Sequence, residues 1–257
     1  MPRKPRRLSS TGIYHVILRS VNQHIIFEED HDFRKFLYIL ADCKKKYDIQ
    51  IYAYCLMDNH IHLLLYAQPD SLAGFFQSLG TKFARWYNNK YSRSGHLFQG
   101  RFHSVAIETH RAFLSALSYI HNNPVKANIC RYPSEYRWNS FNAYFGQKSD
   151  LVTTDVGYKI AGSKHNLQQY LIREDAPLEQ GLFENDHRPP QHFLTDEKAL
   201  ARFKKITKLS NTSETVNLKK PERNTFIRSL REGGLTIRQI ARLMDISETT
   251  VKRYSHA

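Results

Sequence analysis

Hydrophobic periodicity constrains the first 122 residues of this chain more strongly than any other feature of its sequence. Apolar residues recur at the spacing of β-strands in four segments, 13–21, 49–57, 60–66 and 101–108. They recur at helical spacing in three others, 32–47, 71–92 and 110–122. Along the chain, the predicted order is strand, helix, strand, strand, helix, strand and helix.

Turn and capping residues mark the boundaries of these segments. Asp58 and Asn59 supply turn chemistry between two strands, which we expect to pair as a hairpin. Ser71 is expected to cap the second helix. Pro124 is expected to end the third helix, because its ring disfavours the α conformation at Asn123.

The order of the segments favours one architecture. A βαββαβ order is typical of the ferredoxin-like, split βαβ arrangement. We therefore predict an α+β fold with an antiparallel sheet, whose helices pack on one face and whose other face is free to carry a site. This first domain is expected to span residues 1–145.

The remaining residues divide into a middle segment and a C-terminal segment. Residues 146–217 contain scattered turn formers and only short helical patterns, which predict a mixed connector. Residues 218–257 predict an α-helical extension of about three helices, 222–232, 236–243 and 247–254.

The C-terminal segment has the pattern of a helix-turn-helix motif. Apolar residues occupy its buried positions: Ile240, Met244, Ile246, Val251 and Tyr254. Ser247 is expected to cap the second helix of the motif. Asp245 stands where glycine is commonest, and aspartate tolerates the left-handed conformation of such a turn. A three-helix bundle that does not bind DNA is the alternative.

The charge of the chain points to a polyanionic partner. The net charge is +14, of which residues 1–145 carry +9 and residues 218–257 carry +5. Such a balance favours nucleic acid ahead of an acidic membrane surface. No apolar stretch suits a signal peptide or a membrane helix, and the three cysteines lack the spacing of a disulfide framework or a zinc clip. We expect a cytoplasmic, nucleoid-associated protein.

Two histidines on one predicted strand are candidate metal ligands. His60 and His62 are two residues apart, so both imidazoles leave the same face of the sheet. Two such nitrogen ligands on a rigid strand form a natural half of a divalent metal site. The alternative is that they are half-buried sheet residues with hydrogen-bonded ring tips.

The last helix of the first domain supplies a candidate nucleophile. Tyr119 and Asn123 are four residues apart and share one flank of this helix, whereas His121 points away and is assigned a structural or surface role. A divalent ion can polarise a phosphate oxygen while a tyrosine hydroxyl attacks phosphorus. The pattern therefore indicates phosphate chemistry, with a helix-surface tyrosine as the alternative.

Basic residues interleaved with aromatic residues predict contacts to DNA. Cations bind phosphates, and aromatic faces stack unpaired bases. In the first domain the predicted contacts are Lys82, Arg85, Arg93 and Arg101. On the presumed recognition helix they are Thr249, Thr250, Lys252 and Arg253. A solvated basic helix face is the alternative for the first set.

Two of these segments carry a resemblance to a known family. The motifs Asp58–Leu64 (DNHIHLL) and Tyr119–Ala127 (YIHNNPVKA) together resemble those of the single-tyrosine HUH transposases. The strand after Gly12 and the stretch Gly95–Phe102 belong to the same resemblance, which covers about residues 8–145. Within the family, the chain resembles the REP-associated tyrosine transposases.

The resemblance implies a metal-dependent endonuclease and strand transferase that acts on single-stranded DNA containing a hairpin. His60 and His62 would bind Mg²⁺ or Mn²⁺, and Asn123 stands where relatives carry a polar third ligand, often glutamine. Tyr119 would take the 5′ phosphate in a covalent phosphotyrosine and free a 3′ hydroxyl.

Function, DNA partner and oligomeric state each have alternatives that the sequence leaves open. A non-catalytic DNA-binding regulator with the same fold is the rival hypothesis for the function. A zinc hydrolase is a third, but the sequence lacks a suitably spaced carboxylate for it. Duplex DNA is a further expected partner of the helix-turn-helix, and no membrane partner is expected. The sequence is compatible with a monomer or with a homodimer.

Overall fold

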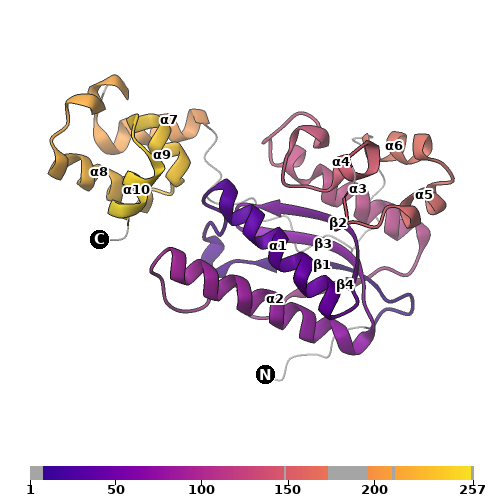
Figure 1. The fold of residues 1–257 in the computed structure, drawn as a ribbon. Coiled ribbons are helices and arrows are strands. Elements are labelled where there is room, and N and C mark those ends of the chain that lie inside the picture. Colours follow the sequence, from indigo (N-terminus) through magenta and orange to yellow (C-terminus); the bar gives the residue numbers. More distant parts are fainter. Residues whose placement is uncertain (1–7, 148, 173–195, 210–211, 256–257) are drawn as a thin grey trace.

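The first domain follows the predicted order of elements. The computed structural model describes residues 8–147, 149–172, 196–209 and 212–255. Its first part contains β1 (Ile13–Arg19), α1 (Asp30–Lys46), β2 (Gln50–Met57), β3 (His60–Tyr66), α2 (Pro69–Lys90), β4 (His103–Ala106) and α3 (His110–Lys126). Short 3₁₀ helices lie at Val21–Gln23 and Pro133–Glu135. Figure 1 shows α1 in front of the sheet and α2 along the lower side of the sheet in this view.

The four strands form one antiparallel sheet in the order β2-β3-β1-β4. This order places β1 and β3 side by side in the middle of the sheet, and the predicted ferredoxin-like arrangement is confirmed. In the register of β1 with β3, Ile17 lies opposite His62 and Arg19 lies opposite His60.

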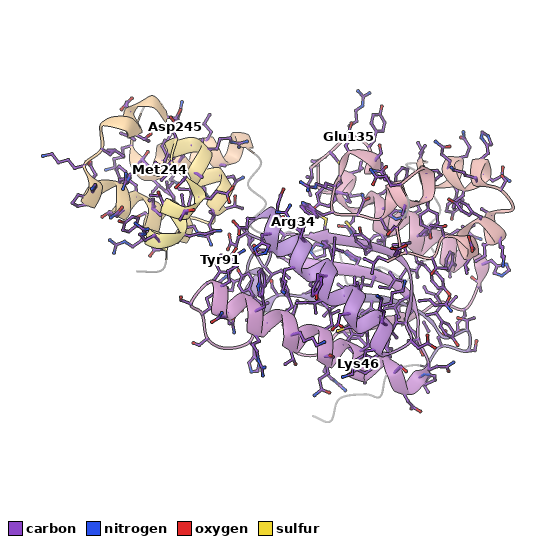
Figure 2. All side chains as sticks on the ribbon, in the orientation of Figure 1. Arg34, Lys46, Tyr91, Glu135, Met244 and Asp245 are labelled. Atoms are coloured by element: carbon purple, nitrogen blue, oxygen red, sulfur yellow. The ribbon has the colours of Figure 1, made fainter. Side chains whose placement is uncertain are left out.

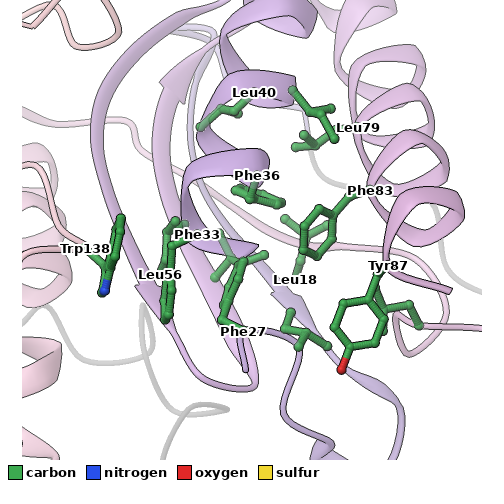
Figure 3. Close-up of a cluster of buried hydrophobic side chains, with 14 of the residues drawn as sticks. Leu18, Phe27, Phe33, Phe36, Leu40, Leu56, Leu79, Phe83, Tyr87 and Trp138 are labelled. Carbon is green, nitrogen blue, oxygen red and sulfur yellow. The ribbon is translucent and has the colours of Figure 1, made fainter. Parts of the chain in front are cut away.

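One face of the sheet packs against α1 and α2. Leu18 of β1, Phe36 of α1 and Phe83 of α2 are buried in this core, and Figure 3 shows them facing one another. Burial of each such side chain contributes about 1.5–3 kcal/mol. This core holds β1 and β3 in place for the residues on their other face.

The second face of the sheet is also covered, so the expectation of helices on one face only is wrong. The helix α3 packs on β2 and β3. A second core forms there, which includes Ala53 and Leu64 of the sheet and Phe113 and Leu117 of α3. Because buried apolar residues such as Ala53 and Leu64 also lie on this face, it too is covered by a helix.

Two predicted helix boundaries are wrong as well. The helix α3 continues through Pro124 to Lys126. Proline removes only its own N–H donor, and the next turn is retained because the Ala127 N–H donates to the Asn123 carbonyl at 3.0 Å. The helix α2 begins at Pro69 with Gln68 as its N-cap, and proline suits this first position, so Ser71 lies inside the first turn.

Among the described residues of the predicted connector there are three α-helices. Of these, α5 (Asp155–Ala161) and α6 (Lys164–Ile172) pack on α3, as Figure 1 shows, whereas α7 (Asp196–Thr207) packs on the C-terminal helices. The helix α4 (Phe141–Phe145) precedes them. These contacts favour a split of the connector between the two flanking parts, and the division into 1–145, 146–217 and 218–257 stays a proposal.

The C-terminal part contains α8 (Lys220–Glu232), α9 (Ile237–Met244) and α10 (Glu248–Ser255), preceded by a 3₁₀ segment, Thr212–Asn217. Thr236 caps α9, and Ser247 accepts a hydrogen bond from the Thr250 N–H at the start of α10. Asp245 follows Met244 with φ of 51°, in the left-handed conformation expected for this turn (Figure 2).

Within the described residues, none of the helices is long and apolar enough to cross a membrane.

Candidate active site

The strands β1 and β3 place their histidines on the face that α3 covers. Side chains alternate along a strand, so the residues opposite each other in the register share a face. On β3 these are His60 and His62, whose ring centroids lie 4.9 Å apart. On β1 they include His15, whose ring stacks on His62 at 5.3 Å. The predicted placement of both β3 imidazoles on one face is therefore observed.

Hydrogen bonds orient the two β3 imidazoles. The Nδ1 atom of His60 lies 2.7 Å from the amide oxygen of Asn59, which only accepts, so His60 donates through Nδ1. The Nδ1 atom of His62 lies 3.1 Å from Nε2 of His15. The side-chain nitrogen of Asn123, which only donates, lies 3.2 Å from Nε2 of His62, so His62 also carries its proton at Nδ1. The lone pair of each ring is therefore at Nε2. This is the arrangement by which proteins orient metal-binding histidines.

His15 was not among the residues predicted from the sequence. Its signal is present: it lies on the first predicted strand, at an odd-numbered position between apolar even-numbered residues. Only the register between β1 and β3 brings it next to His62, and a single sequence does not fix that register.

Burial keeps His62 in its neutral form. Its side chain is fully buried. Burial, and then the positive charges of His60 and Arg19, lower the pKa of His62 well below its usual value. A neutral imidazole is the form that binds a metal ion.

The helix α3 brings the candidate nucleophile to the same place. The Tyr119 ring centroid lies 5.8 Å from that of His62 and 5.9 Å from that of His15. One turn later, the side-chain nitrogen of Asn123 lies 3.2 Å from Nε2 of His62. Three of the four predicted active-site residues, His62, Tyr119 and Asn123, thus meet directly, and His60 joins them through His62.

Two cations that the sequence analysis did not assign flank this group. The Lys126 ammonium lies 4.8 Å from the centroid of the Tyr119 ring. Arg19 lies opposite His60 in the sheet register. Lys126 occupies the position seven residues after Tyr119, a spacing of two helical turns that could have identified it.

The donor set fits a metal ion for which the protein supplies only some of the ligands. Within the described residues there is no group of three or more His, Cys, Asp or Glu side chains arranged around a metal position. Two imidazole nitrogens and an amide oxygen of Asn123 suit Mg²⁺ or Mn²⁺ when phosphate oxygens and water complete the coordination. A closed structural zinc site does not fit these residues.

His121 lies apart from this group, as expected. Its side chain is fully buried and its Nε2 atom lies 2.8 Å from the Ser140 hydroxyl. Burial lowers the pKa of His121 to about 3. Its place in the second core is structural.

The four cations predicted to contact DNA in the first domain are dispersed. Arg85 and Arg101 are exposed and line one cavity, beside α2. Lys82 is exposed and forms an ion pair with Asp42 of α1. Arg93 is half-buried and lies 5.7 Å from the Tyr87 ring centroid.

The four predicted contacts on α10 also differ from one another. Thr249 and Arg253 are exposed, and Thr250 is tied to Ser247 at the start of the helix. Lys252 instead forms an ion pair with Glu29, at the start of α1. A second ion pair, 2.6 Å long, joins Arg231 of α8 to Glu28. These two pairs connect the C-terminal helices to the first domain.

Glu29 is held as a carboxylate by its neighbours. Burial alone would raise the pKa of this side chain, but the ammonium groups of Lys252 and Lys90 lower it to about 2.

Comparison with known proteins identifies two parts of the chain. The family model described as IS200-like transposase matches residues 9–123, and the model described as the helix-turn-helix domain of resolvase matches residues 219–257. No curated protein gives a significant match.

Two solved structures are similar to the chain. One is the REP-associated tyrosine transposase bound to a REP hairpin, with 16% identity, a TM-score of 0.49, and coverage of 61% of this chain and 93% of the other. The other is assigned as a transposase from Deinococcus radiodurans R1, with 22% identity, a TM-score of 0.34, and coverage of 42% and 88%. Because both TM-scores are below 0.5, the assignment rests on the sequence motifs and the family models. Residues 9–123 of this chain match the IS200-like transposase family, and residues 219–257 match a resolvase-type helix-turn-helix.

Proposed function

We propose that this chain is a metal-dependent endonuclease and strand transferase for single-stranded DNA that works through a 5′-phosphotyrosine. The observation that carries the proposal is the meeting of Tyr119 with His62 and Asn123 on one face of the sheet, at ring distances below 6 Å for the tyrosine and histidine. A transposase-like, DNA-processing role agrees with the family of residues 9–123.

In the proposed reaction, the hydroxyl oxygen of Tyr119 attacks a phosphorus atom of the DNA backbone. The bond from this oxygen to phosphorus forms as the bond from phosphorus to the 3′ oxygen breaks. The phenolic proton passes to solvent, and the departing 3′ oxygen gains a proton to become a hydroxyl. Attack by another 3′ hydroxyl reverses these steps and joins two strands without an external energy source.

The metal would be held by His60, His62 and Asn123. When bound, a divalent ion supplies positive charge beside a phosphate oxygen. The chain supplies the orientation of this site: Asn59 fixes the ring of His60, and His15 fixes the ring of His62.

Two flanking cations have a separate role in the proposal. Lys126 lies next to Tyr119, and Arg19 lies opposite His60, so both would bring positive charge close to a phosphate bound there. They would stabilise the negative charge that develops on phosphorus-bound oxygens during the attack.

The substrate and its setting follow from the resemblance and the charge of the chain. A folded single strand that contains a hairpin is the proposed substrate. The helix-turn-helix of residues 219–257 would bind duplex DNA through α10. We propose that the protein acts on DNA in the cytoplasm.

The proposal is tested by trapping the covalent intermediate. Labelled hairpin DNA with single-stranded flanks, incubated with Mn²⁺ or Mg²⁺, is expected to form a protein–DNA adduct that survives denaturant. Tyr119→Phe is expected to form none, because it lacks the hydroxyl. Tyr38→Phe is the matched control, since Tyr38 is 69% exposed on α1, a helix of the opposite face. An undiminished adduct in Tyr119→Phe would refute the assignment.

A DNA-binding regulator without catalysis is the second candidate. The strong positive charge and the helix-turn-helix match favour DNA binding whether or not cleavage occurs. Tight binding of hairpin DNA without an adduct, across substrates with varied flanks and both metals, would favour this candidate.

A further inference from the structure

A cavity of about 670 Å³ lies between α2 and the loop 95–102 that leads into β4. Three aromatic rings contribute to its walls, those of Phe76, Phe98 and Phe102. Arg85 and Arg101 also line it, and none of the described residues that line it carries a carboxylate. Its volume is typical of cavities that enclose a small ligand.

The loop is fixed directly to the strand that carries the candidate active site. The Gln99 N–H donates to the Arg19 carbonyl at 2.8 Å, and Phe98 forms a bridge with Ser20. Leu18 lines the cavity, whereas the neighbouring Arg19 lies opposite His60. The cavity and the candidate active site therefore lie on the two faces of the same end of β1.

The chemistry of the walls suits a nucleobase. Phe98 and Phe102 are half-buried, and the Phe102 ring packs against Phe76 with centroids 4.3 Å apart, so they form a supported aromatic surface. An aromatic surface of this kind stacks an unpaired base of any sequence. Gln77 and Thr81, both exposed on the α2 wall, offer hydrogen bonds to the edge of a base.

The positive charge of the cavity lining favours a nucleic acid strand over uncharged aromatic ligands. Two arginines without a carboxylate among them favour a ligand whose rings are joined to phosphates. Arginine also binds phosphate with paired hydrogen bonds, which fixes the strand on either side of the base.

We propose that this cavity binds one unpaired nucleobase of the DNA strand whose phosphate reaches Tyr119, while Arg85 and Arg101 bind the adjoining phosphates. The inference rests on the proposed function and extends it. It adds a second site of substrate recognition, on the face of the sheet opposite the reacting phosphate. The DNA strand would pass around the edge of the sheet to reach both sites.

Abasic scanning tests the proposal. Full-length protein is titrated with a labelled DNA hairpin with single-stranded flanks, in which one flank nucleotide at a time lacks its base. We expect one or two sensitive positions, where loss of the base weakens binding about tenfold. Flanks in which no position is sensitive would overturn the proposal.

Substitutions that fill the cavity test whether the sensitive base binds there. Ala84→Phe and Thr81→Trp each add a ring to the α2 wall without removing a core side chain. Each is expected to weaken binding of intact DNA about tenfold and to leave unchanged the binding of DNA that lacks the sensitive base. Tyr38→Trp, on α1, is the matched control. Equal losses on both DNAs, or no loss on intact DNA, would contradict the proposal.

The covalent adduct at Tyr119 provides an independent readout. Base-sensitive binding without an adduct would support the proposed base-binding site and contradict the proposed reaction. An adduct without base-sensitive binding would support the reaction and contradict the base-binding site.

Discussion

The sheet domain and the C-terminal helices hold their functional side chains in different ways. His62 is fully buried and touches His15, Asn123 and Tyr119, which come from two different elements. Lys252 on α10 is positioned by an ion pair with Glu29, 223 residues away in the sequence. Packing fixes the first group, whereas charge fixes the second. Added salt should therefore weaken the contact between the C-terminal helices and the sheet domain before it alters the candidate active site.

The largest effect is expected from the most deeply packed member of the site. His62→Ala removes a proposed metal ligand and the partner of Asn123, so adduct formation should fall by more than about 100-fold. The measurement is the rate of adduct formation at saturating DNA and Mn²⁺. His110→Ala, at the exposed start of α3, is the control and should retain the wild-type rate. A rate for His62→Ala within a few-fold of wild type would contradict the proposed site.

His15 should have an intermediate effect. His15→Leu removes the acceptor for the Nδ1 proton of His62, so metal affinity should fall about 10–100-fold. The measurement is the Mn²⁺ concentration that gives half-maximal adduct formation. His15→Gln retains an acceptor and should recover part of this affinity. If His15→Leu and His15→Gln lost affinity equally, His15 would have a packing role only.

The residues of the sheet domain that could be predicted from the sequence are those whose positions depend on local spacing. Period-two spacing was enough to place His60 and His62 on one face, and helical spacing was enough to pair Tyr119 with Asn123. The end of α3 was predicted wrongly from Pro124. The helix continues through this residue, because the loss of one N–H donor is tolerated when the following turn keeps its hydrogen bonds.

What the sequence did not predict depends on long-range contacts. His15 meets His62 only through the register of β1 with β3. The ion pairs of Glu28 and Glu29 with the C-terminal helices depend on how two separate parts of the chain dock. Neither local propensity nor periodicity contains this information, so Lys252 was assigned to DNA alone.

Glu29→Gln should have a smaller effect, in the opposite direction. The change removes the charge that binds Lys252, which then becomes available to duplex DNA. Duplex affinity should rise by about fivefold, in line with about 1 kcal/mol for an ion pair of this exposure. The measurement is a duplex titration at low salt, with Asp70→Asn on the exposed start of α2 as the control. A decrease in affinity would contradict competition for Lys252.

The smallest expected effect is on stability as the pH falls. The pKa of Glu29 is lowered to about 2 in the folded protein, against its usual value of 4.5. Its ion pairs therefore stabilise the protein fully above pH 4.5, and this contribution is lost as the pH falls from 4.5 toward 2. The difference in Tm between wild type and Glu29→Gln should shrink between pH 7 and pH 3. A constant difference over this range would contradict the assigned charge state.

Peptide mapping of the trapped adduct tests the central claim most directly. After nuclease and protease digestion of the wild-type adduct, mass spectrometry should find a nucleotide linked through its 5′ phosphate to the peptide that contains Tyr119. A nucleotide on another tyrosine, or strand cleavage that proceeds with no nucleotide on any peptide, would contradict the account.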